Sequence, residues 1–87
     1  MTYRIEIEPI ALKALARLQK AQPSMAGHVA SAINDLAYDP YRGKPLVGDL
    51  YGFYSLRVGV YRVVYSIDKG RVMVQIIHIG HRKDAYR

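Results

Sequence analysis

Three apolar segments follow one another in the second half of the chain with hardly any sequence between them. They span residues 51–58, 60–68 and 71–79, and they are separated by Gly59 and by the turn Asp68-Lys69-Gly70. Connections this short can join antiparallel strands, whereas parallel strands need a crossover of a dozen residues or more. The spacing therefore predicts a three-stranded antiparallel meander, around which the rest of the fold must be built.

The first half of the chain predicts one strand and two helices. Residues 2–8 alternate between polar and apolar side chains, which is typical of a half-buried strand. Pro9 suits the first turn of a helix, so we expect a helix over residues 9–20. Pro23 begins a second amphipathic segment, which we expect to end near Tyr38. These two helices should form a hairpin that covers one face of the sheet.

The segment from Asp39 to Leu50 contains two prolines and two glycines, which predicts an ordered loop. The whole chain has 87 residues, enough for one domain with one modest core. We therefore expect a single α+β domain over residues 1–87, with the element order β-α-α-β-β-β.

The composition excludes several classes of protein. There is no cysteine, so disulfide bonds and thiolate metal sites are absent. Charged residues interrupt the N-terminal segment, and no later segment reaches membrane-spanning length. We therefore expect a cytoplasmic protein with no membrane partner.

The net charge of +6 is unevenly distributed. Residues 1–39 carry four of the 13 basic side chains and four of the seven acidic ones, so residues 40–87 carry the other nine and three. All of the excess positive charge lies in the second part of the chain, as a surface that binds a polyanion requires, although a solubilising surface is the alternative.

Arg62 has an unusual place in the predicted sheet. Residues 61–67 read YRVVYSI. Because successive side chains of a strand point to opposite faces, one face carries Tyr61, Val63, Tyr65 and Ile67. That face is apolar enough to contact the helices. Arg62 is then expected on the face that no helix covers, in the middle of a strand, where solubility does not require a charge.

Five segments of the chain together resemble a known family. They are GKPL at residues 43–46, GDL at 48–50, SLRVG at 55–59, YRVVY at 61–65 and IGHRKDAY at 79–86. In order and spacing they resemble the RelE/ParE toxin superfamily, and RelE-type toxins in particular. The expected order of strand, helix hairpin and meander is also similar, so the resemblance covers nearly the whole chain.

This resemblance implies the toxin of a type II toxin–antitoxin system. RelE-type toxins are ribosome-dependent endoribonucleases that cut mRNA in the decoding site and inhibit translation. The resemblance also implies an acidic, RelB-like antitoxin as partner, besides the ribosome and mRNA. Cleavage through the 2′-hydroxyl of RNA needs a base, an acid and donors to the phosphate, and it requires no metal or other cofactor.

The arginines and lysines of the shared segments are the candidates for phosphate contacts. Arg62 and Arg82 are expected to clamp the scissile phosphate, because guanidinium groups stay charged and bind phosphate oxygens in pairs. An ion pair with a carboxylate such as Asp49 or Asp84 is the structural alternative. Other phosphates along the RNA backbone would be bound by Lys44, Arg57 and Lys83.

His81 and Tyr86 are the titratable candidates for the proton transfers. Tyr86 is expected to act in acid–base transfer or to stack on a base, although it could instead pack on the edge of the sheet. The case for His81 rests on its place beside the arginines. His78 lies within an apolar strand, which favours a structural role.

One departure from RelE-type toxins leaves two other functions open. Those toxins carry lysines on the strand that here contains Phe53, Tyr54 and Ser55, and this chain has none there. A ParE-like toxin, which binds and poisons DNA gyrase without cutting RNA, is therefore the main alternative. An inactive relative that acts as a DNA-bound co-repressor with its antitoxin is a third.

Overall fold

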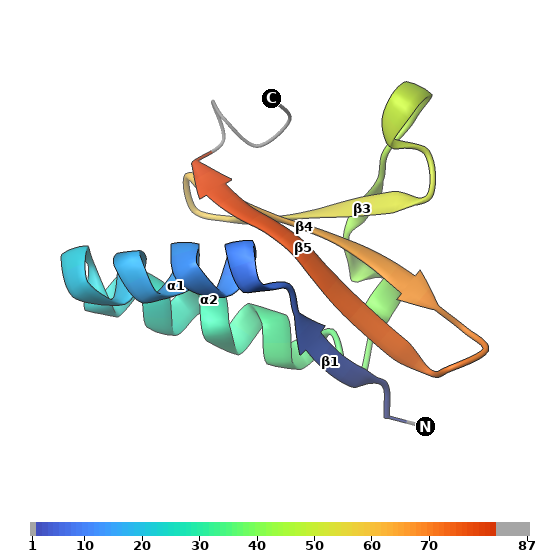
Figure 1. Cartoon of the computed structure of the whole chain (residues 1–87), viewed down its shortest axis with the longest axis horizontal. Coiled ribbons are helices and arrows are strands. Elements are labelled where there is room, and N and C mark those ends of the chain that lie inside the picture. Colours follow the sequence, from blue (N-terminus) through green and yellow to red (C-terminus); the bar gives the residue numbers. More distant parts are fainter. Residues whose placement is uncertain (1, 82–87) are drawn as a thin grey trace.

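The computed structural model describes residues 2–81, and its centre is a five-stranded sheet (Figure 1). The strand order is β1-β5-β4-β3-β2. Strands β3, β4 and β5 are the antiparallel meander that the short connections predicted. The strands span Arg4–Ile7 (β1), Lys44–Pro45 (β2), Phe53–Val58 (β3), Tyr61–Asp68 (β4) and Met73–His81 (β5).

Two helices of 13 residues each lie side by side on one face of the sheet (Figure 1). Helix α1 spans Pro9–Ala21 and helix α2 spans Pro23–Asp35, and each has a proline in its first turn, as predicted. None of the helices in the described range has the length and hydropathy needed to cross a bilayer. The α+β class and the helix hairpin are confirmed.

Helix α2 is shorter than predicted, because it ends at Asp35 and not near Tyr38. The backbone amides of Leu36, Ala37 and Tyr38 donate to carbonyls three residues earlier, so the chain tightens into turns. Leu36 is nevertheless fully buried, so the apolar stripe continues beyond the helix.

Strand β1 pairs parallel with β5, so it joins the meander at its far edge and the helix hairpin forms the crossover. At the opposite edge, two residues of the predicted loop form β2, which pairs with Ser55 and Tyr54 of β3. Short 3-10 turns at Pro40–Arg42 and Gly48–Leu50 flank β2. The loop is therefore ordered, as predicted, but it also adds an edge strand that was not predicted.

The two hairpin turns of the meander have different geometry. Gly59 has a φ of +60° in the two-residue connection between β3 and β4, a conformation that favours glycine. In the second turn Val72 has a φ of +54°, and the Asp68 carboxylate accepts a hydrogen bond from the Arg71 amide. This wider turn delays β5 to Met73, two residues later than predicted.

The core lies between the sheet and the helices. Side chains from both helices, among them Val29 and Ile33 of α2, meet Val63, Tyr65, Val74 and Ile76 of the sheet. Tyr61 and Ile67 also pack against this cluster, so the predicted inward face of β4 is confirmed.

Candidate functional site

Arg62 lies on the face of the sheet that the helices leave open. Its neighbours along β4, Tyr61 and Val63, belong to the helix-covered side, and successive side chains of a strand alternate between faces. Arg62 is partly buried and pairs with Arg57 of β3 on one side and Gly80 of β5 on the other. This confirms its predicted face.

Arg57 and Arg62 form a cross-strand pair of like charges. Residues directly opposite each other in antiparallel strands share one face, with Cβ atoms about 4.5–5.5 Å apart. Like charges directly opposite each other in a sheet are unfavourable, and an anion that both side chains can reach relieves the repulsion. The pair is therefore a ready site for a phosphate group.

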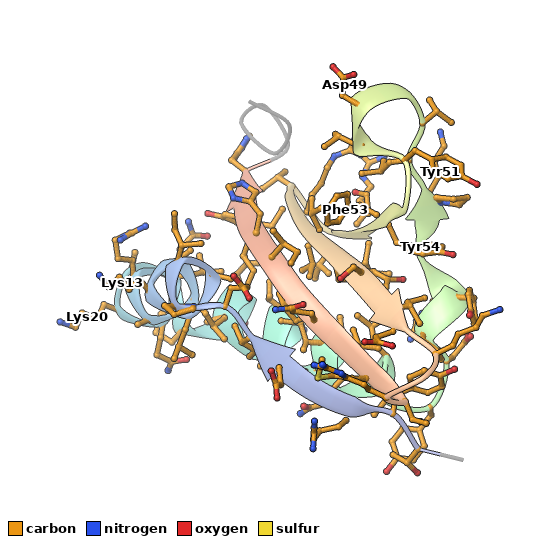
Figure 2. The ribbon with its side chains drawn as sticks, turned by 45° about the vertical axis from the view of Figure 1, so that its right-hand side comes forward. Lys13, Lys20, Asp49, Tyr51, Phe53 and Tyr54 are labelled. Atoms are coloured by element: carbon orange, nitrogen blue, oxygen red, sulfur yellow. The ribbon has the colours of Figure 1, made fainter. Side chains whose placement is uncertain are left out.

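Lys44 adds a third cation to the same face. It pairs with Ser55, which lies two residues before Arg57 on β3. Within residues 2–81, ion pairs join Arg4 to Glu6, Arg42 to Asp35 and Arg71 to Asp68. Neither Lys44 nor Arg57 takes part in these pairs. Asp49 points outward from the loop that follows β2 and away from the sheet (Figure 2).

The floor beside the three cations is buried although neither α1 nor α2 covers it. Ser55, Val64 and His78 lie opposite one another in a row across β3, β4 and β5. Ser55 and Val64 are 5% exposed. Within the described part of the chain, the Ser55 hydroxyl and the His78 Nε2 atom are buried without a hydrogen-bond partner.

The imidazole of His78 lies over the backbone of Gly80. A Cβ atom on Gly80 would come within 2.7 Å of His78 Nε2, and Gly80 is the direct neighbour of Arg62 on β5. His78 therefore contributes to the open face next to Arg62, and its place within an apolar strand concealed this position. A β-bulge, in which Ile77 opposes no residue of β4, turns His78 toward the open side.

The same bulge places His81 on the other side of the sheet. His81 pairs with Tyr61, and their rings meet edge to face with centroids 5.8 Å apart. Tyr61 packs against the core below the sheet. The expectation that His81 and Arg62 form one cluster is therefore not met by the register, because their side chains belong to opposite faces.

Three of the predicted site residues fall beyond the last described residue. Arg82, Lys83 and Tyr86 lie outside residues 2–81, so their roles stay predictions. His81, the last described residue, is adjacent in sequence to Gly80, which pairs with Arg62.

A pocket with a volume of about 330 Å³ opens between the loop after β2 and the cationic part of the sheet. Its walls are mostly apolar, and two cations line it as well. The lining residues are Lys44, Pro45, Leu46, Val47, Leu50 and Arg62.

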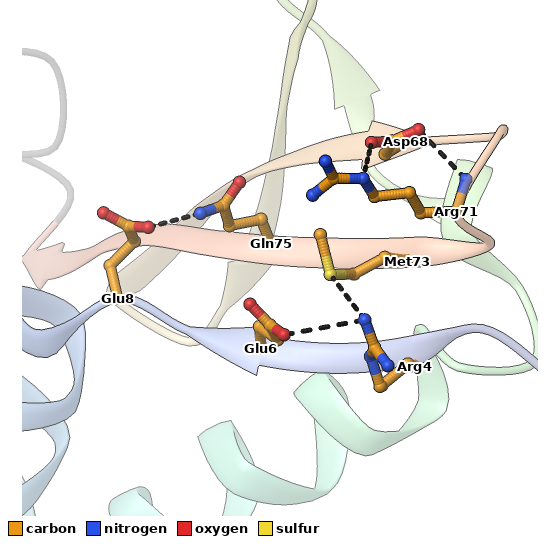
Figure 3. Close-up of polar contacts among 7 residues, drawn as sticks. All are labelled: Arg4, Glu6, Glu8, Asp68, Arg71, Met73 and Gln75. Atoms are coloured by element: carbon orange, nitrogen blue, oxygen red, sulfur yellow. Dashed lines mark hydrogen bonds and ion pairs between the residues drawn. The ribbon is translucent and has the colours of Figure 1, made fainter.

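The opposite part of the same face carries acidic side chains (Figure 3). Arg4 contacts the Glu6 carboxylate at 3.7 Å, and Gln75 donates a hydrogen bond to Glu8. Glu6 and Gln75 are direct partners in the parallel pairing of β1 and β5. The open face is therefore cationic toward β2, β3 and β4 and contains carboxylates toward β1.

A buried tyrosine holds the segment that leads to Lys44. The Tyr65 hydroxyl donates to the Pro40 carbonyl at 2.7 Å and accepts from the Gly43 amide at 2.9 Å. Desolvation by burial raises the pKa of Tyr65, and the Gly43 hydrogen bond only partly offsets this. The phenol is thus a neutral anchor for β2.

No group of three His, Asp or Glu side chains converges as metal ligands would within residues 2–81. The arrangement that the described residues do provide is a cationic cleft with a partly apolar wall. Its chemistry suits an anion that carries an apolar or aromatic substituent.

Comparison with known proteins places this geometry in a family. Residues 5–86 match the model of the family described as the ParE toxin of the type II toxin–antitoxin system parDE. The protein named Toxin RelE of Mycobacterium tuberculosis is 43% identical over 86 residues, which cover 98% of this chain and 87% of that protein. Toxin RelG of the same organism is 43% identical over 72 residues, with 80% and 83% of the two chains covered.

The fold is also similar to that of a solved toxin. The crystal structure of the toxin–antitoxin complex RelBE2 from Mycobacterium tuberculosis contains a chain with a TM-score of 0.83 and 34% identity. The match covers 94% of this chain and all of the other. The family match, the identities and the shared fold agree, and the chain therefore belongs to the RelE/ParE superfamily of type II toxins.

Proposed function

We propose that this toxin cleaves mRNA on the ribosome and holds the scissile phosphate with Arg62. The observation that carries the proposal is the cross-strand pair of Arg57 and Arg62, with Lys44 beside it, on the face that the helices leave open. The relatives named Toxin RelE and Toxin RelG support this side of the superfamily.

The proposed reaction breaks one phosphodiester bond without an external nucleophile. The 2′-oxygen attacks the phosphorus, a base takes the 2′ proton, and the 5′-oxygen leaves with a proton from an acid. Negative charge builds on the non-bridging oxygens, and Arg62 stabilises it by donating two parallel hydrogen bonds. Arg57 and Lys44 bind neighbouring phosphates and thereby fix the position of the RNA along the protein.

The proton transfers are assigned to the end of the chain. Phe53 and Ser55 occupy β3 positions on the open face, so this strand offers no lysine there. We propose Tyr86 as the group that transfers a proton and Arg82 as the second guanidinium that binds the scissile phosphate. Lys83 would bind a phosphate of the RNA backbone. His81 fits a supporting role better, because its ring packs against Tyr61.

We also propose that an acidic antitoxin silences this toxin. Excess positive charge lies in residues 40–87, and the three cations of the open face would attract carboxylates as well as phosphates. The RelBE2 complex is a toxin–antitoxin complex with a chain of the same fold. A segment of such an antitoxin that lies across the open face would exclude RNA by occupying the same cations.

Poisoning of DNA gyrase is the second candidate function. The family model is that of a ParE toxin, and β3 lacks the lysines of RelE-type toxins. Primer extension on ribosome-bound mRNA, run beside a gyrase supercoiling assay, separates the two. We expect new 5′ ends and undiminished supercoiling. Loss of supercoiling with no new 5′ ends would establish the gyrase function instead.

A further inference from the structure

We propose that the pocket between the loop after β2 and Arg62 binds a nucleobase of single-stranded RNA, next to the phosphate held by Arg62. This inference deepens the proposed function and rests on it, since it names a base-binding subsite of the same face. The proposed phosphate contacts use Lys44 and Arg62 but give no role to the apolar wall of the pocket.

The pocket combines the two surfaces that a nucleotide needs. Pro45, Leu46, Val47 and Leu50 provide apolar walls, whereas Lys44 and Arg62 stand at the cationic side. Its volume of about 330 Å³ is at the lower end of small-ligand pockets, which span about 300–1,000 Å³. A flat aromatic base would contact the walls while its phosphate stays on the cations.

The exposure of the loop supports a ligand from outside the chain. Val47 is 82% exposed and Tyr51, at the end of the same loop, is 84% exposed. An exposed apolar wall beside a cationic surface is more typical of a binding site than of a merely solvated surface. Bases of single-stranded RNA are recognised in this way, unstacked and set against apolar or aromatic side chains.

Continuity with the cationic pair favours a nucleotide over an apolar peptide side chain. Arg62 lines the pocket and also pairs with Arg57 across β3 and β4, so the pocket and the phosphate site share one residue. A base that enters the pocket therefore belongs to the nucleotide next to the clamped phosphate. An apolar side chain would contact only the walls, whereas a nucleotide also brings a phosphate to the side lined by Lys44 and Arg62.

The test compares two short oligonucleotides bound to the full-length protein. One is a 2′-O-methyl RNA, which cannot be cleaved through its 2′-hydroxyl, and the other has the same backbone without bases. Fluorescence anisotropy gives the two dissociation constants for the wild type, for Val47→Ser and for the matched control Val60→Ser. Val60 is also exposed, at 42%, but does not line the pocket.

We expect Val47→Ser to weaken binding of the base-containing strand about five- to tenfold and to leave the abasic strand unchanged. Val60→Ser should bind both strands as the wild type does. Arg62→Ala should weaken the binding of both strands. It should also reduce the slope of the logarithm of the binding constant against the logarithm of the salt concentration by about 1. Thermal unfolding should stay the same in Val47→Ser, because its side chain is exposed.

Two results would overturn the inference without touching the proposed nuclease. One is equal weakening of both strands by Val47→Ser, and the other is no weakening of either while mRNA cleavage persists. If Val47→Ser bound RNA normally but lost affinity for an acidic amphipathic peptide, the pocket would be a protein-docking site. If the wild type did not cut ribosome-bound mRNA but still bound the base-containing strand more tightly than the abasic one, only the proposed nuclease activity would be overturned.

Discussion

The Tyr65 hydroxyl and the Gly43 backbone amide lie 2.9 Å apart in the interior, and this contact fixes the start of β2. Gly43 is the residue before Lys44, so the position of that lysine depends on a phenol in the core. There is no room for a larger residue, because a Cβ atom on Gly43 would come within 2.6 Å of the hydroxyl. The core thus positions one cation of the proposed RNA site.

Tyr65→Phe should destabilise the protein by about 1–3 kcal/mol, because the buried Gly43 amide and Pro40 carbonyl lose their shared partner. Urea unfolding at neutral pH measures the change. Tyr38→Phe is the matched control, since Tyr38 is 77% exposed, and it should be neutral. Equal stability of Tyr65→Phe and the wild type would contradict the proposed anchor.

Alkaline pH should weaken the fold through the same hydroxyl. Burial raises the pKa of Tyr65 above its ordinary value of 10.0, so the folded state keeps a proton that the unfolded chain releases. The contribution is fully present below pH 10.0 and is lost as the pH rises toward the folded pKa. Unfolding free energies above pH 10.0 should therefore fall more steeply for the wild type than for Tyr65→Phe. Parallel curves would argue against this coupling.

Gly80→Ala should disturb the ring of His78 beside Arg62 and cost about 1–3 kcal/mol, as overpacking does. The new methyl group would meet His78 Nε2 at 2.7 Å. In a His78→Ala background the same change should cost less, by a coupling of about 0.5 kcal/mol or more. Gly27→Ala, which meets no atom within 4 Å, serves as the control in urea unfolding and should not destabilise. Additive effects would show that the two residues do not touch.

Arg82→Ala and Tyr86→Ala should each slow cleavage of ribosome-bound mRNA. Loss of one preorganised donor or of one acid–base group reduces a rate by about 10²–10⁴-fold. Lys13→Ala is a suitable control, because Lys13 extends from α1 into solvent, away from the open face (Figure 2). Wild-type rates in both variants, with unchanged thermal unfolding, would remove the end of the chain from the proposed site.

The fold could be predicted largely from hydrophobic periodicity and from the length of the connections. Short turns required the antiparallel meander, and the alternation from Tyr61 to Ile67 placed Arg62 on the open face. The end of α2 was missed because Leu36 continues the apolar stripe after the helical hydrogen bonds have stopped. Periodicity reports burial and does not distinguish an α-helix from the tighter turns that follow it.

The site was harder to predict because one extra residue changes the phase of a strand. Strict alternation along β5 would put His81 on the side of Gln75 and His78 on the side of Val74. The bulge at Ile77 reverses both placements. Strand β2 was also missed, because its two residues pair with β3 through backbone contacts that leave no pattern in the sequence.

Single-turnover cleavage of ribosome-bound mRNA by the wild type and by Arg62→Ala tests the role of Arg62 most directly. Arg62 carries the proposed phosphate contact, so its loss should slow cleavage by about 10²–10³-fold while thermal unfolding and ribosome binding change little. Arg17→Ala, an exposed arginine of α1, is the matched control and should cut as fast as the wild type. A wild-type rate in Arg62→Ala would contradict the assignment of this residue to the scissile phosphate.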